Sequence, residues 1–100
     1  MDPFADRMEQ LRTRFRQRAT GDGEALKVAI AAKDRDTAIH ILHSLAGNAG
    51  MFGYPALSTI ASELEQAIAS GAPEVDVLAK LQQLAGELPG QDAAAQKEPG

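Results

Sequence analysis

The sequence predicts an all-α protein, an antiparallel up-down four-helix bundle with an additional N-terminal helix. Apolar residues recur at intervals of three and four along most of the chain, and this spacing places them on one face of a helix. No segment shows the alternating β-branched pattern of a strand. The segments between the later helices are short, so successive helices are expected to be antiparallel neighbours.

The composition is that of one small domain. A chain of 100 residues with 44% hydrophobic content can bury a single core. We assign residues 1–89 to this domain and expect the alanine-rich residues 90–100 to form a disordered tail. The absence of cysteine excludes disulfides and thiolate metal sites, and it favours a reducing compartment such as the cytoplasm.

Charge and hydropathy restrict the classes of partner. The net charge of −4 opposes binding to the phosphate backbone of nucleic acid. The first residues contain no apolar run of the kind found in signal peptides and membrane spans, so no membrane partner is expected. Five arginines nevertheless gather in this segment, where they form either a solvated helix face or a docking surface for an acidic partner. These are Arg7, Arg12, Arg14, Arg16 and Arg18.

Two helices are predicted before residue 34. An apolar stripe at four-three-four spacing marks the first, and it consists of Phe4, Met8, Leu11 and Phe15. The sequence Thr-Gly-Asp-Gly at residues 20–23 is typical of a turn. It separates the first helix from a second one, which ends near Lys33.

Three further helices follow. Asp34 is a candidate N-cap of the next helix, which is expected to end near Gly53. Pro55 suits the first position of the helix after it, and Gly71 can adopt the left-handed conformation that ends that helix. The last helix begins at Pro73. The predicted core positions of these three helices are Ala38, Leu42, Leu45, Ala49, Phe52, Leu57, Ala61, Leu64, Ile68, Val77, Leu81, Leu84 and Leu88.

Two glycines weaken the helix that begins after Asp34. A glycine inside a helix costs about 1 kcal/mol relative to alanine, and both Gly47 and Gly50 lie within this one. At about 100° per residue they share a face with His43, away from the apolar stripe. We therefore expect His43 to point to solvent, beside a surface that is bare of side chains and open to a large partner. Spacing alone equally allows these glycines to serve tight helix packing or to fray the helix end.

The stretch from His43, His-Ser-Leu-Ala-Gly-Asn-Ala-Gly-Met-Phe-Gly, resembles the signature of histidine phosphotransfer (HPt) domains. Residues 57–68, with their acidic Glu-Leu-Glu, are similar to the helix that follows in that family, and the resemblance covers about residues 4–88. Ala46 departs from the pattern, because the family usually has a lysine there that helps to neutralise the phosphoryl group. The positions that match the motif are His43, Leu45, Gly47 and Gly53.

The resemblance implies that His43 accepts a phosphoryl group from an aspartyl phosphate on a receiver domain and passes it to another receiver in a two-component phosphorelay. A neutral imidazole is a nucleophile at physiological pH and needs no activating triad. The chain would be a monomeric phosphocarrier and not an enzyme, without a cofactor of its own, and the receiver would hold magnesium. Glu65 occupies a position from which the family often hydrogen-bonds the imidazole, although it could equally be an exposed helix-face carboxylate.

The residues around His43 allow further interpretations. Ile39 and Ala46 flank it, and they form either a small apolar docking patch or the packed edge of the core. His40 lies one turn before His43, but no third histidine or cysteine completes a metal site, so none is assigned. His40, Arg35 or a cation from another helix could supply the charge of the missing lysine, and the sequence does not decide among them. The residues assigned to partner docking are Ile39, His40, Ala46, Gly47 and Gly50.

An adaptor function is the alternative to phosphoryl transfer. The absence of lysine at Ala46 would also suit an HPt-like adaptor that binds receiver domains without phosphoryl transfer. The presence of His43 favours transfer.

Overall fold

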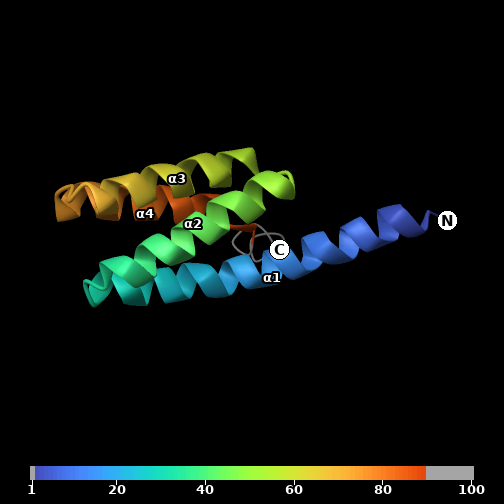
Figure 1. Cartoon of the computed structure of the whole chain (residues 1–100), viewed down its shortest axis with the longest axis horizontal. Coiled ribbons are helices and arrows are strands. Elements are labelled where there is room, and N and C mark those ends of the chain that lie inside the picture. Colours follow the sequence, from blue (N-terminus) through green and yellow to red (C-terminus); the bar gives the residue numbers. More distant parts are fainter. Residues whose placement is uncertain (1, 90–100) are drawn as a thin grey trace, which may run out of the picture.

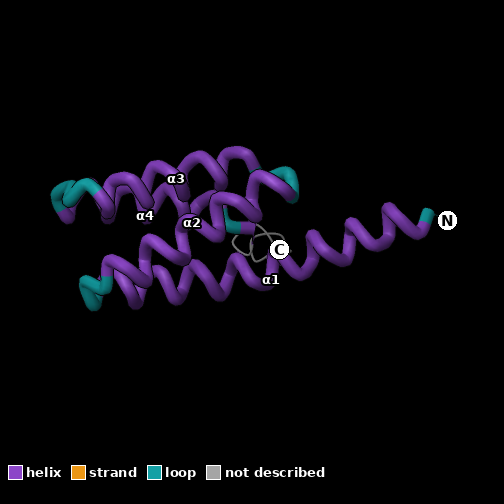
Figure 2. The backbone as a smooth tube through the Cα atoms, viewed as in Figure 1, coloured by secondary structure: helices purple, strands orange, loops and turns teal. Residues whose placement is uncertain are grey.

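The structure is a computed structural model that describes residues 2–89. This part of the chain contains four α-helices and no strand, as Figure 1 shows. Short turns join the helices (Figure 2). Helix α2 packs against α1 and α3, and α3 packs against α4. The all-α class is thus confirmed, whereas the tail expected at residues 90–100 lies outside the described residues. The helices are α1 (Pro3–Ala31), α2 (Arg35–Met51), α3 (Pro55–Ala69) and α4 (Glu74–Glu87).

The helix ends use the predicted signals. The backbone N–H of Thr37 donates a hydrogen bond of 3.2 Å to Oδ1 of Asp34, which caps the N-terminus of α2. Pro55 is the first residue of α3, where its missing N–H leaves no hydrogen bond unmade. Gly71 follows α3 with a φ of 77°, a conformation that glycine adopts without a steric clash.

The turn predicted at residues 20–23 is absent, and the two helices predicted before residue 34 are one. Helix α1 runs without a break for 29 residues. Gly23 is buried in it, and a Cβ atom added there would lie 2.7 Å from Cδ1 of Leu88. Gly23 therefore allows the segment after α4 to approach α1 closely. The prediction of a separate N-terminal helix is wrong because residues 20–23 remain helical, with Gly23 packed beneath Leu88 and Gly21 exposed on the surface of α1.

The beginning of α1 extends beyond the other helices (Figure 1). Every buried residue of α1 lies at or after Phe15, and we call residues 3–14 the arm. Phe15 packs at the base of the arm, where its ring centroid is 5.6 Å from that of Phe52 and 5.3 Å from that of Tyr54. These aromatic contacts join α1 to the turn between α2 and α3.

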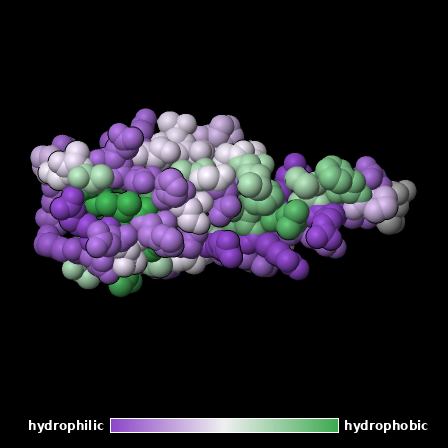
Figure 3. Space-filling model, in the orientation of Figure 1, coloured by the Kyte–Doolittle hydropathy of each residue, from purple (hydrophilic) through white to green (hydrophobic). Residues whose placement is uncertain are grey.

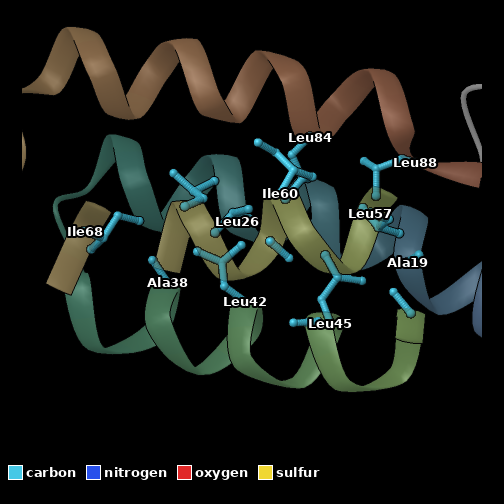
Figure 4. Packing of buried hydrophobic residues seen from close by; sticks show 14 of the residues in the cluster. Ala19, Leu26, Ala38, Leu42, Leu45, Leu57, Ile60, Ile68, Leu84 and Leu88 are labelled. Atoms are coloured by element: carbon cyan, nitrogen blue, oxygen red, sulfur yellow. The ribbon is translucent and has the colours of Figure 1, made fainter. Parts of the chain in front are cut away.

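The core lies among the four helices. Figure 4 shows Leu42 and Leu45 directed from α2 toward α3. Burial of a leucine side chain stabilises a fold by roughly 1.5–3 kcal/mol, so the buried leucines decide which face of each helix points inward. Among the predicted core positions, Phe52 and Leu81 are only partly buried and pack at the edge of the core. The largest fully buried side chains are Leu26, Leu42, Leu45, Leu57, Leu64 and Leu84.

The start of α2 is joined to the end of α3. Nη2 of Arg35 donates hydrogen bonds of 3.1 Å to the carbonyl oxygens of both Ile68 and Ala69. The last carbonyl groups of a helix have no partner within it, and a positive charge is favourable at that end of the helix dipole. Arg35 thereby fixes α2 relative to α3.

Candidate functional site

His43 stands on the outer face of α2. Leu42 and Leu45 are fully buried, and their packing fixes the rotation of α2 about its axis. The imidazole, on the opposite side, is 82% exposed. The histidine thus points to solvent, as the apolar spacing of this helix predicts.

Glu65 of α3 faces the histidine across the groove between the two helices. Its Oε2 lies 3.4 Å from Nδ1 of His43, slightly longer than a typical hydrogen bond of about 2.7–3.2 Å. The carboxylate side chain is 24% exposed, far less than the imidazole. Burial of Leu64, its neighbour in the chain, holds α3 in this orientation. Glu65 therefore opposes one ring nitrogen, and Nε2 is the nitrogen that it leaves free.

An open hollow of about 570 Å³ adjoins His43 on the side of α3. Ser62 and Gln66 line it together with Glu65. Hydroxyl and amide groups donate hydrogen bonds to anionic oxygens. The sequence reasoning missed these two residues, although each lies within one helical turn of Glu65.

Gly47 and Gly50 have different surroundings. A Cβ atom added at Gly47 would meet nothing within 4 Å, so the surface one turn beyond His43 is open. A Cβ atom at Gly50 would lie 3.4 Å from Oγ of Ser58 in α3, and that hydroxyl donates a 2.8 Å hydrogen bond to the carbonyl of Ala46. Gly50 is exposed but borders α3. A Cβ atom at Gly50 would therefore make an ordinary contact with Ser58, so the approach of α3 does not by itself require a glycine there.

The apolar neighbours of His43 belong to the core or its edge. Ala46 is 9% exposed and lies in the core cluster, and Ile39 is half-buried against it. The apolar docking patch expected from Ile39 and Ala46 is therefore corrected for Ala46, because packing against α3 leaves it little surface for a partner. His40 is exposed.

The structure narrows the choice of a cation near the site. Arg35 is occupied at the end of α3, and Lys80 contacts Glu63 at 3.4 Å. Of the two residues named as candidates from the sequence, His40 is the one that remains exposed on the face of His43. Within residues 2–89, no group of three or more histidine, cysteine, aspartate and glutamate side chains is arranged to hold a metal ion.

The fold and the site together define a class of protein, a helical bundle in which an exposed histidine faces a carboxylate of the neighbouring helix. The family model described as Hpt domain matches residues 10–95, so the chain belongs to the Hpt domain family. Hpt domains are phosphocarrier modules that act in phosphorelays by histidine phosphotransfer and interact with receiver domains. Comparison with curated proteins and with solved structures gave no match to the chain. Across residues 2–89, none of the helices is both long and apolar enough to traverse a bilayer.

Proposed function

We propose that His43 accepts a phosphoryl group from the aspartyl phosphate of one receiver domain and transfers it to the aspartate of another. The observation that carries this proposal is the pairing of an 82% exposed imidazole with the less exposed Glu65 at 3.4 Å. An exposed ring on a rigid helix allows the bulky aspartyl phosphate to approach in line, and positioning contributes much of phosphoryl-transfer catalysis.

The pairing with Glu65 selects the reacting nitrogen. A carboxylate opposite Nδ1 favours the neutral tautomer that carries its proton on Nδ1, which leaves the lone pair on Nε2. Nε2 attacks phosphorus, the bond from phosphorus to the aspartate oxygen breaks, and the aspartate leaves as a carboxylate. The ring then carries a positive charge, which Glu65 offsets. Attack by the second receiver's aspartate reverses these steps and returns the electron pair to Nε2.

The surface next to His43 supports docking of a receiver. The open surface at Gly47 lets the partner's backbone approach the imidazole, and exposed His40 lies on the same face. Ile39 and Gly50 form the edges of the docking surface. The receiver supplies magnesium, whose charge stabilises the transferring phosphoryl group.

Ala46 carries no charge, so other groups must stabilise the phosphoryl group where the family usually has a lysine. Ser62 and Gln66 line the hollow beside His43 and could donate hydrogen bonds to phosphoryl oxygens. We infer that Ser62, Gln66 and His40 together supply part of the stabilisation that a lysine gives to the phosphoryl group in other members of the family. Phosphorylated His43 is then less stabilised by charge than it would be beside a lysine, which favours onward transfer.

Incubation with a receiver domain that carries a radiolabelled aspartyl phosphate tests the proposal. The native chain is expected to acquire an acid-labile and alkali-stable label, as a phosphohistidine does, and His43→Gln is expected to acquire none. His40→Gln distinguishes the two histidines of this helix face, since it is expected to retain the label, although it acquires it more slowly because His40 belongs to the docking surface. Absence of label across a panel of receivers that bind the chain would establish the adaptor instead.

A further inference from the structure

The arm presents an apolar stripe that no other helix of residues 2–89 covers. Figure 3 shows apolar side chains gathered on the arm between hydrophilic ones. Phe4 is 71% exposed, whereas Met8 and Leu11 are half-buried and continue the stripe toward Phe15, where it enters the core. Such an exposed stripe marks a contact surface when it is contiguous.

Arginines border this stripe on both sides. At 100° per residue, the stripe lies between two arginine rows, and the carboxylates of Asp2 and Asp6 lie on the far face of the helix. Glu9 contacts Arg12 at 3.7 Å and Arg16 at 3.5 Å. An arm laid on the arm of a second copy would bring arginine against arginine, which is unfavourable. The two rows are Arg7, Arg14 and Arg18 on one side, and Arg12 and Arg16 on the other.

The outer face of α4 has the complementary composition. Val75 is 71% exposed and Leu78 is 47% exposed. The only lysine of this helix, Lys80, is already paired with Glu63. The carboxylate of Glu74 contacts Lys33, in the turn between α1 and α2, at 3.7 Å. At 100° per residue Glu74 lies beside Leu78 and Asp76 lies beyond Val75, whereas Glu87 lies on the side of α4 opposite Leu78, so Glu74 and Asp76 are the carboxylates at the edges of this apolar face. The carboxylates of α4 are Glu74, Asp76 and Glu87.

We propose that the arm of one copy packs on the outer face of α4 of a second copy, and that the contact is made twice in a reciprocal pair. Phe4 and its neighbours cover Val75 and Leu78, and arginines meet the carboxylates of α4. A stable interface buries about 1,200–2,000 Å² in total. One arm on one helix is small on this scale, and closure of the pair doubles the area.

The proposal differs from the monomer expected from the sequence, because the arm becomes visible only when α1 is seen to pass beyond the bundle. Neither surface includes His43 or Glu65. The pair therefore leaves the histidine accessible. Dimerisation and phosphoryl transfer can be tested independently of each other.

Sedimentation velocity over a wide range of protein concentration tests the pair. The native chain is expected to reach twice the monomer mass, and both Phe4→Asp and Val75→Asp are expected to remain monomeric. Val28→Asp is the matched control, since Val28 is 68% exposed on α1 but lies on neither surface, and it is expected to dimerise. High salt weakens the native pair, because it screens exposed charges.

Mixing the two monomeric variants decides which surfaces meet. Phe4→Asp retains an intact α4 and Val75→Asp retains an intact arm, so the mixture preserves one of the two contacts. At high concentration it is expected to associate more strongly than either variant alone and more weakly than the native chain. Monomers at every concentration of the native chain, an unaffected Phe4→Asp variant or a mixture no more associated than either variant alone would each overturn the proposal. The proposal would also be overturned if the native chain were monomeric and bound phosphatidylglycerol vesicles through Phe4, because the arm would then be a lipid-binding segment. Circular dichroism verifies that each variant is folded.

Discussion

Oε2 of Glu65 lies 3.4 Å from Nδ1 of His43, although the two residues belong to different helices. Two features hold them there. Leucines on the inner faces of α2 and α3 set the rotation of each helix, and Arg35 joins the start of α2 to the last carbonyls of α3. The contact is therefore a product of the bundle and not of local sequence.

Glu65→Gln is expected to slow phosphoryl transfer to His43 by about tenfold, by analogy with the lower end of the loss when a metal-bound histidine loses its orienting carboxylate. Stability should change by no more than about 0.5 kcal/mol, as is usual for substitutions near the surface. Nitrogen NMR of the phosphorylated protein should show phosphate on Nε2 in the native chain and a mixture of both ring nitrogens in the variant. Glu63→Gln, on the same helix, is the control, and an equal slowing there would contradict the orienting role.

Gly47→Leu is expected to slow transfer while leaving the domain folded. The added side chain meets no atom of the chain itself within 4 Å of its Cβ position, so it stabilises α2 by roughly 0.5–1 kcal/mol through helix propensity and obstructs only an approaching receiver. Transfer kinetics and urea denaturation measure the two effects. Gly21→Leu is the matched control, because Gly21 is also an open helical glycine but lies on α1. Transfer by Gly47→Leu at the native rate would refute the docking role of this surface.

Gly23→Leu is expected to destabilise the fold by about 1–3 kcal/mol, the usual cost of overpacking a core. The reason is the 2.7 Å separation between its added Cβ and Cδ1 of Leu88. Urea denaturation compares it with Gly21→Leu, two residues earlier, where the same change meets open space. Equal stability of the two variants would argue against the close approach of Leu88 to α1.

Asp22→Asn is expected to raise the melting temperature at pH 7. Burial raises the pKa of the Asp22 carboxyl above its ordinary 3.8, and the charge of Arg18 lowers it only in part. The folded state therefore binds this proton more tightly than the unfolded chain, so the group's stabilising contribution is present below pH 3.8 and is lost as the pH rises through the folded-state pKa. Thermal denaturation at several pH values should show that the variant melts above the native chain at pH 7, and that this difference in melting temperature disappears below pH 3.8. A variant that melts below the native chain at pH 7 would contradict this account.

The outward orientation of His43 could be predicted from the sequence because it depends on periodicity alone. Residues three and four apart share a helix face, so the leucines that flank His43 determine which side of α2 is free. The cap at Asp34 and the left-handed Gly71 are local in the same sense, since each involves residues within one turn. The turn predicted at residues 20–23 is wrong, because the close approach of Leu88 to Gly23 joins distant parts of the chain and cannot be recognised from local sequence.

The sequence by itself determined the helical class, the helix ends after residue 34, and the histidine together with the family motif that surrounds it. These follow from local backbone preferences and from the spacing of apolar residues. Only the tertiary structure decided that α1 is continuous and leaves an uncovered arm, that Ala46 is buried, that Gly50 borders Ser58, and that Glu65 faces Nδ1. Each of these depends on how one helix packs against another, and packing is set by contacts between residues far apart in the chain.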